Sequence, residues 1–229
     1  MKKIFSIILV IICLVSYNNT IAQFGLNLGI KAGSNFSTLS FDPDIGQGRS
    51  KSSAMGGEFG GIISFDITSV LAIQVEPTYA QEGCSLNGPL FFDGVNIVNG
   101  KTSYNLEYLE IPILVKLKIP LPTTSLSPFV FLGPKIGKLL SSKEKDEPTG
   151  LASSEIDLKD YINSKNFSVE FGAGAEYKLV NNILISLDLR YSLGTENILT
   201  NKGEQYFGIM SQKIKTTGLQ IVAEAIIQI

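Results

Sequence analysis

The stretch NFSVEFGAGAEYK, residues 166–178, decides the fold, because its apolar side chains fall at every second position. These apolar residues are Phe167, Val169, Phe171, Ala173, Ala175 and Tyr177, and only Ser, Glu and Gly stand between them. A period of two is that of a β-strand, whose successive side chains point to opposite faces of a sheet. The stretch therefore predicts a strand with one apolar face and one small or charged face.

Seven other runs have the same period, and the one at 128–138 is the weakest because residues 129–132, Phe-Val-Phe-Leu, are all apolar. The seven are residues 24–36, 55–66, 70–81, 104–119, 128–138, 183–192 and 215–229. Eight is an even number, as the closure of an up-and-down antiparallel barrel prefers. The sequence thus predicts an all-β fold, an eight-stranded antiparallel up-and-down β-barrel.

The connections between these runs alternate in length, which favours a barrel in a bilayer. The long ones are about 37–53, 82–103, 139–165 and 193–214, and the short ones are 67–69, 120–126 and 179–182. Outer-membrane barrels have long outer loops and short periplasmic turns. With a periplasmic amino end, every long connection falls on the outer side, so we expect a transmembrane barrel in the outer membrane.

The first 22 residues have the pattern of a signal peptide. Lys2 and Lys3 precede an apolar run at 4–15, and small residues lead up to Ala22. That order is typical of export signals, and the run is shorter than the ~20 residues that a membrane helix needs. We expect cleavage after Ala22, which leaves residues 23–229 as the barrel domain.

Periodicity alone does not say which face of the barrel points outward, because a soluble barrel encloses its apolar face and a membrane barrel exposes it. The polar face combines glycines with charges of both signs, which suits a narrow eight-stranded interior. Buried charges need partners, so we expect a paired network in the interior and interpret it as structural filling rather than as an ion path. Its expected members are Lys31, Glu58, Glu76, Glu110, Lys116, Glu170, Glu176, Asp188, Arg190 and Glu224.

One segment, Tyr108-Leu109-Glu110-Ile111-Pro112 followed by Ile113-Leu114-Val115-Lys116, resembles a strand of the porin-family, PorT-like outer-membrane β-barrel proteins of Bacteroidetes. Other segments match in the same order over essentially the whole mature chain: residues 29–33, 76–79, 81–83, 133–134, 172–174 and 190–191. The resemblance implies an outer-membrane barrel without an assigned activity. It also implies a link to secretion and gliding machinery, as for some PorT-like relatives.

The composition excludes several kinds of chemistry. The chain has no His, which removes the commonest general base and metal ligand. Without Lys2 and Lys3, the 21 acidic residues exceed the remaining 17 basic ones by four, which is not the pattern of a nucleic-acid-binding protein. We therefore expect no enzyme activity, no cofactor and no metal site. Cys84, the one cysteine of the mature chain, is expected to be an inert thiol at a strand end.

Three functions remain open at this point. The favoured one is a structural or interaction barrel whose outer loops contact a partner, so that deleting 139–165 removes binding but spares the barrel. Within that loop, Ser153 or Ser154 is expected to cap a short helix through residues 155–162. The alternatives are a small passive pore and a soluble periplasmic lipid-binding barrel. The expected partners are outer-membrane lipid and an envelope or secretion-machinery protein, with no nucleic acid, and the protein is expected to be a monomer.

Overall fold

The computed structural model describes residues 25–42, 49–92, 94, 96–119, 121, 124–180, 182–206 and 213–229. The predicted signal peptide, residues 1–22, lies outside these residues. The elements are β1 (Gly25–Asp42), β2 (Ser50–Asp66), β3 (Leu71–Val75), β4 (Thr78–Phe92), β5 (Ile97–Lys118), β6 (Leu126–Pro148), β7 (Ser154–Asp157), β8 (Lys165–Val180), β9 (Ile183–Gly194), α2 (Asn201–Tyr206) and β10 (Lys213–Gln228). Among the helices so described, none is long and apolar enough to cross a bilayer.

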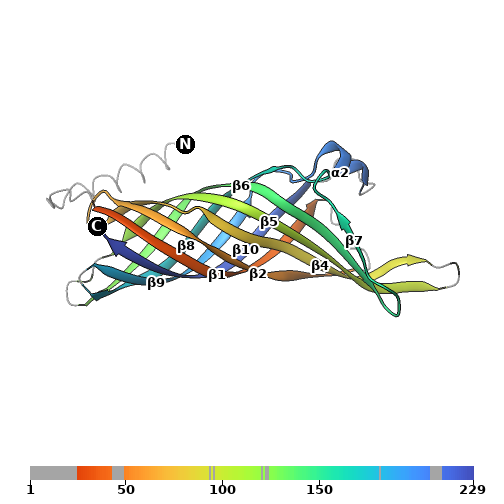
Figure 1. Ribbon diagram of the computed structural model, residues 1–229, viewed down its shortest axis with the longest axis horizontal. Helices are drawn as coiled ribbons and strands as arrows, with labels where there is room; N and C mark the ends of the chain where they lie inside the picture. The colour runs from red at the N-terminus through yellow and green to blue at the C-terminus, as the bar shows by residue number, and fades with distance from the viewer. Residues whose placement is uncertain are drawn as a thin grey trace.

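The strands close into a ring in which every neighbouring pair is antiparallel (Figure 1). The order around the ring is β1, β2, β4, β5, β6, β8, β9 and β10, and β10 pairs with β1 to close it. β3 and β4 are two parts of one strand interrupted at Glu76 and Pro77, and β7 is a short addition to the edge of β6. The predicted eight-stranded up-and-down barrel is therefore confirmed.

The apolar face of the strands points outward. Ile30, Phe59 and Leu187 are 69%, 62% and 60% exposed, whereas their polar neighbours in sequence are buried in the barrel. Such an outer surface suits the hydrocarbon of a bilayer and is costly in water. This arrangement confirms the membrane orientation and contradicts the soluble lipid-binding alternative, which requires the apolar face inside.

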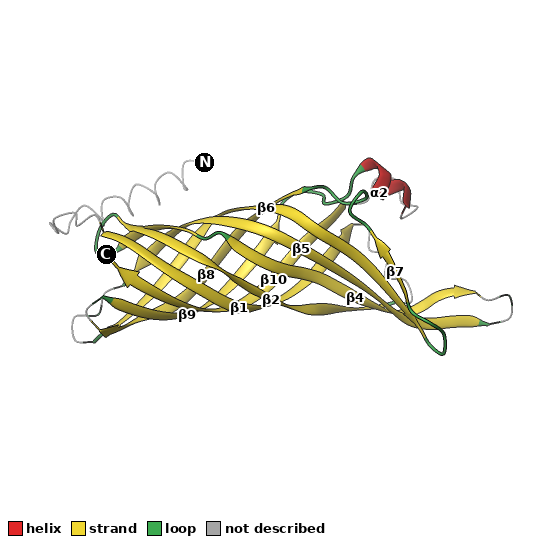
Figure 2. Cartoon of the chain, viewed as in Figure 1, coloured by secondary structure: helices red, strands yellow, loops and turns green. Residues whose placement is uncertain are grey.

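The two ends of the barrel differ, as the alternation of loop lengths predicts. The strand ends that the short connections join, at Asp66 and Leu71, at Lys118 and Leu126 and at Val180 and Ile183, lie at the end that also holds Ile229 and the start of β1. The opposite end carries α2, β7 and a ribbon formed by β4 and β5 that projects beyond the rim (Figure 2). We call this the outer end and the end with short turns the inner end.

At the outer end, the strands are longer than the sequence predicts. β4 and β5 take up most of the loop predicted at 82–103, and β6 continues to Pro148, through the first part of the loop predicted at 139–165. The predicted helix at 155–162 is wrong, because Ser154–Asp157 pairs with β6 as β7 and a turn follows. In these outer parts the regular alternation of apolar and polar side chains is lost while the backbone ladder continues.

Candidate functional site

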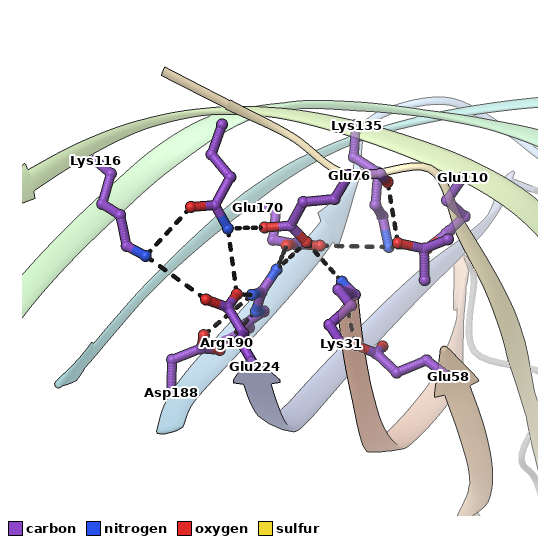
Figure 3. A network of polar contacts seen from close by, with 12 residues as sticks. Lys31, Glu58, Glu76, Glu110, Lys116, Lys135, Glu170, Asp188, Arg190 and Glu224 are labelled. Atoms are coloured by element: carbon purple, nitrogen blue, oxygen red, sulfur yellow. Dashed lines mark hydrogen bonds and ion pairs between the residues drawn. The ribbon is translucent and has the colours of Figure 1, made fainter. Parts of the chain in front are cut away.

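Arg190 on β9 is the centre of the charge network in the barrel interior (Figure 3). Its guanidinium donates two hydrogen bonds to Asp188, at 2.6 and 3.0 Å, and one to Glu224 on β10 at 2.6 Å. It also donates to Glu76 at 2.6 Å and to Glu170 on β8 at 3.2 Å. One buried cation therefore connects side chains from four parts of the wall.

Two lysines extend this network across the barrel. The Lys31 ammonium on β1 lies 2.7 Å from Glu76 and 3.4 Å from Glu58 on β2. Lys116 on β5 lies 2.7 Å from Glu176 on β8 and 3.7 Å from Glu224. Gln74 links the two groups, because its amide nitrogen donates to Glu76 at 2.7 Å and its oxygen accepts from Lys116 at 3.2 Å.

A third group surrounds Lys135 on β6, which the sequence analysis missed. Its ammonium lies 2.9 Å from Glu110, 3.5 Å from Glu82 and 3.7 Å from Glu170. Lys135 follows the run 129–132, whose continuous apolar residues hide which face points inward. Glu82 was placed in a predicted loop. The spacing could have identified Lys135. It lies two residues after Gly133, four after Phe131 and six after Phe129, on the same face of the strand.

All ten residues expected from the sequence lie in the interior, each 5% exposed or less. Together with Glu82, Lys135 and the pair of Asp66 and Lys118 nearer the inner end, they comprise nine carboxylates and five cations. The carboxylates are Glu58, Asp66, Glu76, Glu82, Glu110, Glu170, Glu176, Asp188 and Glu224, and the cations are Lys31, Lys116, Lys118, Lys135 and Arg190. This group of side chains therefore has four more acids than bases.

Two aromatic rings support the cations from the wall of β6. Phe131 lies under Arg190, with the guanidinium 5.1 Å from the ring centroid, and Phe129 lies 3.9 Å from the Lys116 ammonium. Cations are attracted to the faces of such rings, most strongly where water is excluded. Gly172 and Gly174 on β8 face Phe131 and Phe129 in the register, and a Cβ at either glycine would meet the ring. The glycines make room for the rings.

Apolar side chains close the outer end of the interior. Two outer segments, 158–164 and 195–200, fold into the barrel mouth, where Asn163 donates hydrogen bonds to the carbonyls of Asn197 and Leu199 at 3.0 and 2.9 Å. The resulting cluster contains Leu39, Cys84, Leu86, Tyr104, Leu106, Tyr108, Leu139, Leu158, Ile162, Ile198, Leu199 and Ile214. We call this cluster the outer plug. Cys84 lies in it, within β4 and fully buried, rather than at a strand end.

At the inner end, a polar hollow of about 320 Å³ opens between the short turns and is lined by Asp66, Lys118, Glu176 and Lys178 among others. It does not continue outward as a wide channel. The space enclosed by Gln74, Lys116, Phe131 and Arg190 leaves no volume for a water molecule. The interior is therefore blocked by the charge network in the middle and by the outer plug above it.

This blockage predicts that the barrel does not conduct ions. Single-channel recordings of the purified chain in planar bilayers are expected to show no conductance steps, because side chains fill an eight-stranded interior. A variant with Arg190 intact but with the outer plug weakened, Leu158→Ala with Ile198→Ala, should remain silent because the charge network still closes the middle. Discrete steps from the unmodified chain would contradict the prediction.

In the part of the chain that the structure describes, no group of three or more Cys, Asp and Glu side chains is arranged to hold a metal ion.

Comparisons with known proteins agree with this architecture. A family model described as an outer membrane protein beta-barrel domain matches residues 21–199. The solved structure of the outer membrane protein OprG from Pseudomonas aeruginosa is similar, with a TM-score of 0.52 at 11% identity over 92% of this chain and 97% of OprG. Neisserial surface protein A matches with a TM-score of 0.46 at 12% identity, covering 87% of this chain and 96% of its own. No curated protein sequence matches. At these identities the structural likeness is one of fold.

Proposed function

Because this chain belongs to the family of outer membrane protein β-barrel domains and lies in the outer membrane, we propose that it presents an interaction surface at the outer end of a sealed barrel. The barrel anchors that surface in the lipid and catalyses no reaction. The partner is a protein of the envelope or of a secretion machinery, and the barrel itself acts as a monomer.

The projecting ribbon of β4 and β5 is the observation that carries this proposal. β4 last pairs with β2 at Asn87, and β5 first pairs with β6 at Gly100, so residues 88–92 and 97–99 have only each other as strand neighbours. Phe91, Phe92 and Ile97 on this ribbon are 48%, 64% and 64% exposed. Large apolar side chains grouped beyond the lipid mark a surface for binding another molecule.

We also propose a more specific family for this chain within the outer-membrane barrels. The segment 108–112, with the other matching segments along the chain, supports a place among the PorT-like porin-family barrels of Bacteroidetes. In the structure, Glu110 of this segment faces the interior beside Lys135, and Pro112 pairs with Lys135 across the ladder. The segment thus contributes to the filling of the barrel, which is compatible with an anchoring role.

Shortening the ribbon tests the proposal. Asn87 and Lys101 face each other in the register, so residues 88–100 can be replaced by Asn-Gly, a pair that favours a two-residue hairpin turn. We expect the variant to insert normally, shown by an unchanged shift between heated and unheated samples on a gel. We also expect it to lose the envelope proteins that are cross-linked to the intact chain in cells.

A photo-reactive side chain at Phe92 gives the direct readout, and the same group at Leu187, on the lipid-facing wall, is the matched control. The proposal predicts protein adducts at position 92 and lipid adducts at position 187. Identical sets of cross-linked proteins from the intact and shortened chains would refute it. Deletion of 139–165, which the loop pattern of the sequence suggests, is unsuitable because this segment includes paired residues of β6 and the buried Leu158 and Ile162.

A further inference from the structure

Lysines at the outer ends of β5 and β6 lie opposite carboxylates in the strand register. Lys101 of β5 lies opposite Glu147 of β6. Lys145 of β6 lies opposite Glu155 of β7, and its ammonium is 2.7 Å from Glu147. Opposite charges that face each other across a ladder stabilise a sheet, and like charges directly opposite destabilise it. The outer parts of these strands therefore follow the favourable arrangement.

One pair of lysines on the outer surface of the barrel breaks this pattern. Lys138 of β6 and Lys165 of β8 lie directly opposite each other in the register. Both are exposed, and their side chains point to the same face of the sheet, since residues opposite each other in an antiparallel ladder share a face. In the described part of the chain, neither ammonium has an ion pair or a hydrogen bond with another side chain.

The pair lies at the outer edge of the lipid-facing wall. Leu109 of β5 is opposite Lys138, and Ile136 is the next outward residue of β6 toward the inner end; both are exposed apolar side chains. β8 begins at Lys165, so none of its outward residues lies beyond the pair. A lysine in such a place can lay its aliphatic stem on apolar surface and hold its ammonium among lipid headgroups.

An anion shared by the two lysines would convert their repulsion into attraction. The repulsion is stronger beside lipid than in bulk water, because the dielectric constant is lower there. A phosphate monoester carries a charge of about −1.5 to −2 at neutral pH, which matches two lysines, and has three oxygens that accept hydrogen bonds. Because this wall faces the bilayer, the molecule that carries the phosphate is a lipid.

We propose that Lys138 and Lys165 together bind the phosphate group of a lipid headgroup in the outer leaflet. Each ammonium donates hydrogen bonds to phosphate oxygens, and the acyl chains of the lipid lie along the apolar wall of β5, β6 and β8. The site is part of the lipid-facing wall and is independent of the ribbon in the proposed function.

Native mass spectrometry of the protein released from nanodiscs tests the site. The nanodiscs contain phosphatidylcholine with a small share of phosphatidic acid, whose headgroup is a phosphate monoester, and the protein should retain phosphatidic acid preferentially. Each lysine beside an anionic lipid strengthens binding about fivefold, so Lys138→Gln with Lys165→Gln should weaken retention about 25-fold. Lys202→Gln is the matched control, because Lys202 is exposed on α2, away from the lipid-facing wall (Figure 2), and it should leave retention unchanged.

Lys138→Glu gives a second variant, which separates lipid binding from folding. It places a carboxylate opposite Lys165, and a pair of opposite charges stabilises the ladder. The urea midpoint in phosphatidylcholine liposomes should therefore equal or exceed that of the unmodified protein, whereas the retention of phosphatidic acid should be lost.

Two other anions in phosphatidylcholine nanodiscs decide what the pair recognises. Oleic acid offers a carboxylate on a lipid, and inorganic phosphate offers a phosphate without one. We expect the protein to retain both more weakly than phosphatidic acid. The proposal is overturned if phosphatidic acid is not retained preferentially, if the double variant or Lys138→Glu retains it unchanged, or if oleic acid or inorganic phosphate is held equally well.

Discussion

Arg190→Met is expected to abolish stable folding of the barrel. The substitution leaves Glu76, Glu170, Asp188 and Glu224 in the interior without the cation that bonds to all four. Removing one partner of a buried ion pair costs about 3–5 kcal/mol, and an entire domain is stable by about 5–15 kcal/mol. Refolding into liposomes, followed by urea titration and the heat-dependent gel shift, measures the loss.

Two further variants give this prediction its controls. Lys143→Met breaks an ion pair whose side chains are 52% and 50% exposed, so we expect the urea midpoint to stay close to that of the unmodified protein. Combining Arg190→Met with Glu224→Gln and Asp188→Asn removes two of the stranded charges and should recover part of the stability. An Arg190→Met chain with the urea midpoint of the unmodified protein would show that the network contributes nothing to folding.

Gly172→Ala is expected to destabilise the barrel substantially, although it adds only one methyl group. Its Cβ would meet the Phe131 ring, the Leu189 carbonyl oxygen and the Arg190 backbone together. Overpacking of this kind costs about 1–3 kcal/mol. The displaced Phe131 would also lose its position under the Arg190 guanidinium. The urea midpoint in liposomes should therefore fall measurably.

Gly57→Ala is the matched control, because a Cβ at Gly57 has no atom within 4 Å. We expect this variant to be neutral or slightly stabilised, since alanine reduces the freedom of the unfolded chain. In a Phe131→Ala background the further cost of Gly172→Ala should be smaller but not zero, because the ring is gone while the Leu189 carbonyl still opposes the methyl group. Equal midpoints for the two alanine variants would contradict the crowding argument.

The sequence predicts the part of the fold that lies in the bilayer. There, lipid contacts one face and the filled interior the other, so each strand needs alternating side chains, as 166–178 shows. The outer parts of β4 and β6 escape prediction because the regular alternation breaks down there, although Leu86 and Leu139 still point into the outer plug and the backbone pairing continues. The segment 155–162 looked helical because its apolar residues have mixed spacing, and in the structure Leu158 and Ile162 instead fill the barrel mouth.

The charge network is also predictable from the sequence only in part. Alternation identifies which residues of a strand point inward, and this placed all ten expected residues in the interior. Which of them meet depends on the stagger between strands, for instance the approach of Arg190 to Glu76, which is 114 positions earlier in the chain. No local pattern carries that information. Lys135 and Glu82 were missed because one follows an unbroken apolar run and the other lies beyond the alternating part of its strand.

The pairing of β1 with β10 affects how long the protein stays folded. These are the first and last strands of the barrel, so their meeting is the slowest contact to find and completes the ring. Yet their ladder runs without a break from Asn27–Gln228 to Asp42–Lys213, whereas β2 and β4 meet only in two short blocks. The pair of strands that forms last is therefore among the hardest to separate. Unfolding out of the membrane should then begin between β2 and β4 and be very slow. The lifetime of the folded protein would depend on this rate of unfolding as much as on its equilibrium stability.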